Sequence, residues 1–353
     1  MAYTTIDKPS DYFNTVLWTG NDTDDRTISG VGFSPNWAWI KARNNADAHY
    51  LVDTVRGSTK VIFSNSNSAE DTRVSAVKSF ASDGYVLGQE AQVNRNSGTF
   101  VAWNWLAETS FTNDASSTSI GSIDSAGSFN NDAGFSICSF TGNGTSGASV
   151  KHGLSTKPAM MIIKNRDEAD SWQVYHHKNT SAPATETLQL NETGGTTDTA
   201  NRWNDTEPTT AILTLGDNPT VNKSGIKYIV YIFSEKQGYS KFGSYTGNGN
   251  ADGTFVYLGF KPAFFLVKRS DSTTSWTLLD NKRDPFNVTT ERLFPNENVA
   301  GSVGTNANTD FLSNGVKIRV NHNNFNNSGG SYIYMAFAEN PFVTSTGVPA
   351  TAR

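Results

Sequence analysis

The chain of 353 residues contains a single cysteine, Cys138. One cysteine cannot form a disulfide within the chain, and a zinc site would need further cysteines or histidines at regular spacing. Cys138 lies in the apolar run Phe135–Phe140, so we expect a buried, unreactive thiol.

Histidines are few and are poorly spaced for metal binding. The sequence has five: His49, His152, His176, His177 and His322. His176 and His177 are adjacent, but neighbouring residues of a strand point to opposite faces. The acidic stretch Asn21–Asp25 could offer oxygen ligands to calcium, although it lacks the glycine and the distal glutamate of an EF-hand loop. We expect a polar hairpin tip there, with a weak calcium site as the alternative, and no metal site or cofactor elsewhere.

Basic clusters and long apolar runs are also missing. The net charge of −5 is spread along the chain without a basic stripe, so nucleic acid is not an expected partner. No apolar stretch approaches the ~20 residues of a membrane helix, so membrane insertion is not expected. Residues 1–8 lack the basic region and the apolar core of a signal peptide, and we expect a soluble protein made in the cytoplasm.

The composition instead favours β-structure. The chain has 30 glycines, is rich in Thr, Ser, Asn and Asp, and has few strong helix formers. Aromatic residues make up 12% of the chain, so we expect cores that depend on large rings.

One sequence frame occurs three times. It starts with glycine and an apolar residue, contains a proline, and ends in lysine after an apolar run: Gly32–Lys41, Gly153–Lys164 and Gly259–Lys268. Each frame predicts a strand that begins near its proline, where the missing N–H costs no ladder hydrogen bond. Successive residues of the strand are apolar, so both of its faces should be covered, by its own unit and by loops or a neighbouring unit.

Other landmarks recur in the same order around the frame. A Thr-Gly-Asn turn precedes each copy, starting at Thr19, Thr141 and Thr246. Eight residues after each frame lysine stands His49, Trp172 or Trp276, followed by an apolar pair. Each copy closes with Ser-Gly and an apolar strand that ends in a glutamate ten residues after the glycine, at Glu108, Glu235 and Glu339. Landmarks that agree in order indicate an internal repeat.

The repeat divides the chain into units of about 100 residues, the size of a small β-sandwich. We expect an N-terminal lead-in at 1–11, sandwich units at 12–108, 135–235 and 242–339, a Ser/Asn/Gly-rich linker at 109–134 and a C-terminal tail at 340–353. The predicted fold is all-β, with three tandem jelly-roll or concanavalin-like sandwiches.

No catalytic constellation stands out, and we expect neither an enzyme nor catalytic residues. The sequence has no Gly-x-Ser-x-Gly motif, and each unit offers one recurrent glutamate, whereas a glycosidase needs two facing carboxylates. The frame lysines Lys41, Lys164 and Lys268 should emerge into solvent, as protection of a strand edge or, alternatively, as contacts for an anionic ligand.

Three tryptophans, Trp172, Trp203 and Trp276, lie in or beside loops. Rings in such positions either fill a core or stack on sugars. We take these three as the candidate ligand-binding residues, because ligand contacts concentrate in loops on a rigid scaffold.

Several stretches resemble structural proteins of marine bacteriophages, cyanophages among them. The closing stretch Tyr332–Phe342 resembles the end of many such proteins. Further stretches resemble the same group: Asp132–Thr145, Lys164–Asp167 with Ser171-Trp172, and Val31–Lys41 with Asp53–Gly57. The resemblance implies a tail fibre or another virion appendage without an assigned activity.

We therefore expect a bacteriophage virion structural protein on the particle surface: a tail fibre, tail tip or capsid decoration that serves host attachment or particle assembly. Its expected partners are other virion proteins and further copies of itself, as a homotrimer. A second hypothesis is a carbohydrate-binding adhesin that contacts a host surface glycan. A third is a polysaccharide depolymerase, which would need a carboxylate pair about 5–9.5 Å apart.

Overall fold

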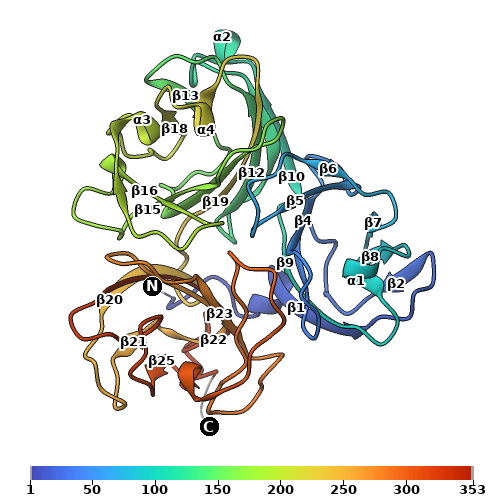
Figure 1. The fold of residues 1–353 in the computed structure, drawn as a ribbon. Helices are drawn as coiled ribbons and strands as arrows, with labels where there is room; N and C mark the ends of the chain where they lie inside the picture. Colours follow the sequence, from blue (N-terminus) through green and yellow to red (C-terminus); the bar gives the residue numbers. More distant parts are fainter. Residues whose placement is uncertain (1, 351–353) are drawn as a thin grey trace.

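The computed structural model describes residues 2–350 and confirms the all-β prediction. The strands of its sheets pair in the antiparallel sense, and the helices are single turns of three or four residues. Figure 1 shows three lobes around a common centre, and each lobe holds one copy of the repeat.

Unit 1 (residues 12–108) has a six-stranded main sheet and a three-stranded second sheet. The main sheet contains, in spatial order, β1 (Phe13–Thr19), β9 (Thr99–Trp105), β3 (Trp37–Ala42), β4 (Tyr50–Asp53), β5 (Lys60–Phe63) and β6 (Asp71–Thr72). The second sheet contains β2 (Arg26–Ile28), β8 (Gly84–Leu87) and β7 (Val77–Ala81). The helices are η1 (Pro9–Asp11), just before the unit, and α1 (Ala91–Asn94).

Unit 2 (residues 109–235) has an eight-stranded main sheet and a two-stranded second sheet. The main sheet contains β10 (Thr109–Asn113), β11 (Ser125–Asn130), β12 (Phe135–Thr141), β19 (Lys227–Phe233), β14 (Met160–Asn165), β15 (Gln173–His176), β16 (Glu186–Gln189) and β17 (Thr197–Asp198). The second sheet contains β13 (Ala148–Lys151) and β18 (Ile212–Leu215). The helices are α2 (Ala115–Thr118), η2 (Pro183–Thr185), α3 (Ala200–Trp203) and α4 (Pro219–Asn222).

Unit 3 (residues 236–341) has a four-stranded main sheet and a three-stranded second sheet. The main sheet contains β20 (Ser240–Thr246), β26 (Ser331–Pro341), β22 (Phe260–Arg269) and β23 (Thr277–Asp280). The second sheet contains β21 (Phe255–Tyr257), β25 (Gly315–Ile318) and β24 (Thr309–Leu312). The short helix η3 (Thr305–Ala307) precedes β24.

The three main sheets share one central order, in which the frame strand is always the third of four: β1-β9-β3-β4, β12-β19-β14-β15 and β20-β26-β22-β23. Pro35 and Pro158 precede their frame strands, as expected. Pro262 lies within β22, at a shift of the register with β26 that lets the strand continue without its N–H. The stretch Ala211–Leu215, whose sequence only loosely resembles the other copies, forms β18 at the place of β8 and β25.

The two apolar faces of each frame strand contribute to different cores. Trp37 and Trp39 of β3 belong to a central core that all three units share, whereas Ala38 and Ile40 belong to a core inside unit 1. The other frame strands alternate in the same way, with Met160, Ile162, Phe264 and Leu266 in the central core. The expected coverage of both faces is thus correct, and the neighbouring units supply it.

The units are joined in a ring by a hydrogen bond that occurs three times. The carbonyl oxygen two residues after each frame lysine accepts the backbone N–H of a loop residue from the adjacent unit: Arg166 from Glu70 at 2.8 Å, Ser270 from Thr196 at 2.7 Å and Arg43 from Gly301 at 2.6 Å. Each unit therefore donates to the next one, and the third donates back to the first. A head-to-tail contact of this kind closes when the rotation between units is one third of a turn.

The segments outside the repeat are also built into the structure. The stretch 109–134, expected as a linker, contributes β10 and β11 to the main sheet of unit 2. Its polar residues suit strands at the edge of an antiparallel sheet, where solvent can reach one face of the sheet. In the lead-in, Ile6 enters the central core and Tyr3 donates to the carbonyl oxygen of Gly259 at 2.6 Å. In the tail, the Ser345 N–H donates to Asp7 Oδ1 at 2.6 Å.

Candidate functional site

The three tryptophans proposed for glycan stacking are buried. Trp172 is 0% exposed, and Trp203 and Trp276 are 1% exposed. Trp172 Nε1 donates to the carbonyl oxygen of Phe63 at 2.9 Å, and Trp276 Nε1 donates to that of Gln189 at 2.9 Å, so each bond joins two units. Because the loops fold back over the sheets, these rings fill interfaces and cores. Their proposed role as sugar-stacking residues is wrong.

The frame lysines are also buried, contrary to the expectation that they emerge into solvent. Lys41, Lys164 and Lys268 are all 0% exposed. Each ammonium donates to the carbonyl oxygen of the next residue in its strand and to one in the loop that follows. Lys164 also donates to Asn67 of unit 1 at 3.2 Å, and Lys268 to Thr193 of unit 2 at 3.2 Å. Burial lowers the pKa of each lysine to about 8. These lysines hold loops in place and are not exposed at the surface.

Burial also decides the state of the histidines and of Cys138. It lowers the pKa of His176 to about 3 and that of His152 to about 4, so both rings are neutral near pH 7. It raises the pKa of the Cys138 thiol to about 12, which keeps the thiol protonated and unreactive. Within residues 2–350, no group of three or more His, Cys, Asp and Glu residues is placed to hold a metal ion.

The Thr-Gly-Asn turns are held by three buried asparagines that the sequence analysis did not single out. Their Oδ1 atoms accept a backbone N–H of the turn in every unit: Asn94 from Asn21 at 3.2 Å, Asn222 from Asn143 at 2.9 Å and Asn326 from Asn248 at 2.8 Å. A signal was present in the sequence, since each asparagine follows an apolar residue and is followed within four residues by the Ser-Gly pair of its unit. In the structure the residue three positions after each asparagine has a positive φ: Ser97, Gly225 and Gly329.

The recurrent glutamates have separate surroundings and are not all equivalent. Glu108 accepts two hydrogen bonds from Asn130 Nδ2, at 3.0 and 2.8 Å, and Glu339 Oε2 lies 2.6 Å from Lys261 Nζ. Burial raises the pKa of Glu235. The sheet register aligns Ala107, and not Glu108, with the other two glutamates, because the positive-φ position of unit 1 is Ser97 rather than the following glycine.

A buried charge cluster links units 1 and 2. Arg56 Nε lies 2.6 Å from Asp53 Oδ2, and its Nη1 lies 3.2 Å from Glu70 Oε2. Arg166 of unit 2 donates to the same Glu70 from Nε at 2.9 Å and from Nη2 at 3.0 Å. Tyr231 of unit 2 donates to Asp53 Oδ2 at 2.7 Å. The acids and bases neutralise one another, so the cluster orients two units and leaves no group free for catalysis.

The same arrangement links units 3 and 1. Arg283 Nε lies 2.5 Å from Asp280 Oδ2, and Arg43 donates to Glu291 at 3.1 and 2.9 Å. Trp103 Nε1 takes the place of the tyrosine hydroxyl and donates to Asp280 Oδ2 at 3.1 Å. The shared Asp-x-x-Arg spacing was a signal in the sequence that the repeat analysis did not use.

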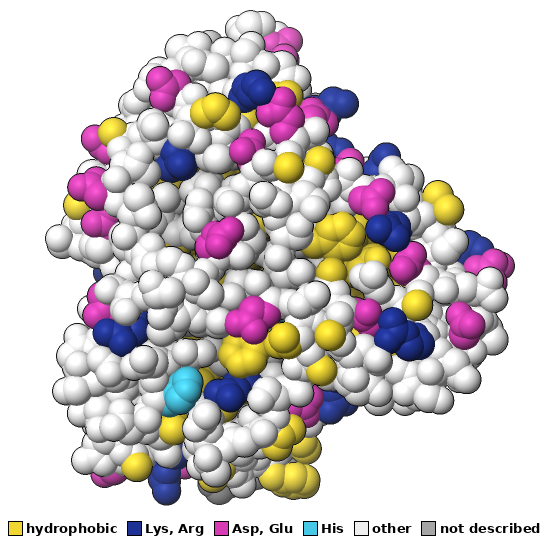
Figure 2. All heavy atoms as spheres, viewed as in Figure 1, with side chains coloured by type: hydrophobic (Ala, Val, Ile, Leu, Met, Phe, Trp, Pro, Cys, Tyr) yellow, Lys and Arg dark blue, Asp and Glu magenta, His cyan; other side chains and the backbone are white. Residues whose placement is uncertain are grey.

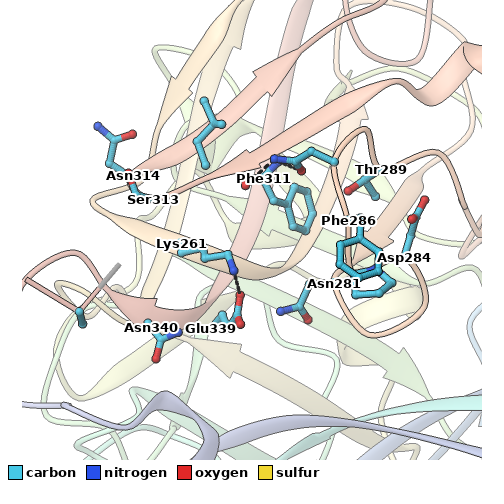
Figure 3. A pocket seen from close by; sticks show the side chains of 14 residues that line it. Lys261, Asn281, Asp284, Phe286, Thr289, Phe311, Ser313, Asn314, Glu339 and Asn340 are labelled. Carbon is cyan, nitrogen blue, oxygen red and sulfur yellow. Dashed lines mark hydrogen bonds and ion pairs between the residues drawn. The ribbon is translucent and has the colours of Figure 1, made fainter. Parts of the chain in front are cut away.

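A cavity with a volume of about 560 Å³ lies in unit 3. Its walls come from the start of β22 (Lys261), the loop after β23 (Asn281, Asp284, Phe286), the β24–β25 hairpin and the end of β26 (Glu339). Figure 3 shows Asn281 between the Lys261–Glu339 ion pair and the ring of Phe286. The cavity therefore combines an exposed aromatic ring, an amide and a paired charge.

The loop that carries Phe286 is anchored on both sides of the ring. Asp284 Oδ2 accepts the N–H of Thr290 at 2.7 Å and its hydroxyl at 3.2 Å. Asn287 accepts the N–H of Phe311 at 2.8 Å and donates to the carbonyl oxygen of Phe311 at 3.1 Å. Phe286 itself is 78% exposed. An anchored loop thus presents an apolar ring to solvent.

Unit 2 has a cavity of about 490 Å³ at the corresponding place. Lys157 precedes the frame proline as Lys261 does, His177 follows β15 as Asn281 follows β23, and Glu235 corresponds to Glu339. Lys157 forms an ion pair with Glu207 across this cavity. The lining contains no aromatic residue other than His177, which separates it from the cavity of unit 3.

The visible surface carries no large patch of one charge. Figure 2 shows acidic and basic side chains interspersed over this face. Among residues 2–350, no helix has both the length and the apolar character needed to cross a membrane.

Comparison with curated proteins gave no match. A family model described as "Domain of unknown function (DUF7483)" matches residues 8–341, a range that contains all three units. One model for the whole range agrees with a fold in which the units share a central core. The chain belongs to this DUF7483 family.

Proposed function

We propose that the chain is a structural protein on the surface of a bacteriophage particle, as a tail fibre, tail tip or capsid decoration, and that it serves host attachment or particle assembly without catalysis. The observation that carries the proposal is the closed ring of three units around one core. Its buried charges, its aromatic rings and parts of its long loops join the units, and other loop segments, such as the one that carries Phe286, remain exposed. A rigid body with variable loops suits display and recognition.

The resemblance of Tyr332–Phe342 and of the frame stretches to phage structural proteins supports the same proposal. Further support comes from the nature of the buried polar groups. Lys164, His176 and Asp53, for example, have partners within the protein, as expected where polar groups stabilise a fold.

In the particle we propose a homo-oligomer, in the form of a trimer. Because the ring consumes the repeated faces inside one chain, copies would associate through outer surfaces. β21 is one such surface, since Phe255 is 42% and Tyr257 is 52% exposed at its two ends. Light scattering on the purified chain measures this assembly, and a strictly monomeric mass at high concentration would contradict it.

Virion localisation is tested by mass spectrometry of density-purified particles of a phage that encodes the chain. We expect its peptides at a constant ratio to the major capsid protein across the particle band. Peptides that are abundant in the infected lysate but absent from the particle band would overturn the proposal.

A second candidate function is glycan binding. The three tryptophans no longer support it, but the exposed ring of Phe286 beside a polar cavity does.

A further inference from the structure

We propose that the cavity of unit 3, between Phe286, Asn281 and the Lys261–Glu339 ion pair, binds a neutral saccharide. The proposal deepens the host-attachment function and rests on it only for the location of the site on a particle. Saccharides present an apolar C–H face and a ring of hydroxyl groups, and the cavity offers a partner for each.

The apolar partner is the ring of Phe286. It is 78% exposed although its loop is anchored by Asp284 and Asn287. Exposed apolar area is unfavourable in water, and the flat C–H face of a sugar would cover it. The position of the ring at the edge of a cavity of about 560 Å³ places it beside polar groups that could hold the rest of the ligand.

The polar partners lie across the cavity from this ring. The Oδ1 atom of Asn281 is buried and has no hydrogen-bond partner in the protein. Buried acceptors are normally paired, and a rotation of the Asn281 side chain toward the cavity that it lines would let a sugar hydroxyl donate to this atom. The Lys261–Glu339 pair, 2.6 Å apart, adds donors and acceptors for further hydroxyl groups. Figure 3 shows these groups around one space.

The charges of the lining select against anionic ligands. Lys261 is opposed by the two carboxylates Asp284 and Glu339, so the charged groups of the lining sum to about −1. A phosphate, a uronic acid or a sialic acid would meet net repulsion there. A neutral sugar avoids this cost.

The two carboxylates also favour binding over hydrolysis. Asp284 Oδ2 is engaged by Thr290 and by the N–H of Glu291, and Glu339 is engaged by Lys261. A glycosidase needs one carboxyl group free to donate a proton and a second free to attack or to activate water. Asp284 and Glu339 are instead held in the walls of the cavity by these hydrogen bonds and this ion pair.

The cavity of unit 2 shows what unit 3 adds. It has the corresponding lysine and glutamate, Lys157 and Glu235, but it lacks an exposed aromatic ring. It also holds the charged pair partner Glu207 and a second lysine, Lys178. The sugar site is therefore assigned to unit 3 alone.

The test is an array of neutral oligosaccharides, built from hexoses, N-acetylhexosamines and deoxyhexoses, with sialylated and sulfated glycans on the same slide. The isolated full chain is probed together with the variants Phe286→Ala, Asn281→Ala and Val303→Ala. Val303 is the matched control, because it is 73% exposed and lies in the same long loop but does not line the cavity. Thermal melting of each variant checks its fold, and Phe286 and Asn281 are not packed in any of the cores.

We expect the wild-type chain and Val303→Ala to retain at least one neutral glycan. Phe286→Ala and Asn281→Ala should bind it about tenfold more weakly or worse, the loss typical of truncating a central contact. Absence of neutral glycan binding, retention of anionic glycans only, or binding by both cavity variants that equals that of the wild-type chain would each overturn the inference. Particle mass spectrometry tests the proposed virion location without any sugar, so the two can fail separately.

Discussion

The shared central core predicts that the three units unfold together. The ring centroid of Trp37 in unit 1 lies 4.3 Å from that of Tyr231 and 5.7 Å from that of Phe135, both in unit 2. The ring centroid of Phe13 in unit 1 lies 4.9 Å from that of Phe337 in unit 3. A unit that unfolded alone would expose these faces on its neighbours. We therefore expect one cooperative transition for the whole chain.

The size of the transition distinguishes the two possibilities. At about 0.7 kcal/mol per residue, one transition of 353 residues has an unfolding enthalpy of about 250 kcal/mol near 60 °C, against about 70 kcal/mol for one unit of about 100 residues. Scanning calorimetry gives the calorimetric enthalpy, and the shape of the peak gives the van't Hoff enthalpy. We expect the ratio of the calorimetric to the van't Hoff enthalpy to be near one, whereas three independent units would give a ratio of about three.

Two variants sharpen this test. Leu266→Ala removes a buried side chain from the central core, and Leu279→Ala removes one from the core inside unit 3. Each should lower the free energy of unfolding by about 2–5 kcal/mol. For a loss of about 4 kcal/mol, the midpoint of a whole-chain transition falls by about 5 °C, but that of a single unit would fall by about 19 °C. A separate early peak in Leu279→Ala alone would refute the shared-core reasoning.

Three further predictions concern buried polar groups. Lys164→Met leaves the carbonyl oxygens of its loop unpaired and should lower the free energy of unfolding in urea by about 1–3 kcal/mol, whereas Lys8→Met at an exposed site should have no effect. Asn326→Ala removes three hydrogen bonds to the turn and one to the carbonyl oxygen of Val320, and it should cost about 3 kcal/mol or more in the same assay; a loss below about 0.5 kcal/mol would contradict the turn-holding role. His176 has its pKa lowered to about 3, so the folded state binds fewer protons than the unfolded state below pH 6.5. Its contribution to stability is complete above pH 6.5 and is lost as the pH falls toward 3, by up to about 1.4 kcal/mol per pH unit, and His176→Gln should flatten the slope of urea stability between pH 6.5 and 4.5.

The repeat could be predicted from the sequence because it depends on local signals. Glycine, proline and a run of apolar residues mark each frame strand whatever surrounds it. The unbroken apolar character of Trp37–Ile40 also indicated that both faces are covered. It could not indicate that one face meets two other units, because period-two patterns report burial and not the identity of the neighbour.

The side chains proposed as surface groups were misjudged for one physical reason. Lys164, Lys268, Trp172 and Trp276 stand at strand ends, where an isolated sandwich would meet solvent. In the ring, a loop or a strand end of the adjacent unit covers each of these ends. Phe286 was overlooked for the opposite reason, since a single phenylalanine in a polar loop carries no pattern, and only the anchored loop shows that its ring stays outside.

The three interfaces of the ring are not alike, and the difference follows from which partner each acid meets. Asp53 accepts from the Tyr231 hydroxyl and Asp280 from Trp103 Nε1, two residues at the same position of the sheet register. The corresponding residue of unit 3 is Met335, which offers no donor. Unit 2 accordingly has no aspartate at that position.

At the position that Asp53 and Asp280 occupy in their units, unit 2 carries His176, whose Nε2 lies 3.1 Å from the backbone carbonyl oxygen of Tyr334. A buried carboxylate facing a methionine would lack a donor from the neighbouring unit. A neutral histidine can instead donate to a backbone carbonyl group, which is present whatever the side chain. The middle unit thus departs from the pattern of its neighbours where the strand it faces carries Met335 in place of a donor, and His176 finds its partner in the backbone of that strand.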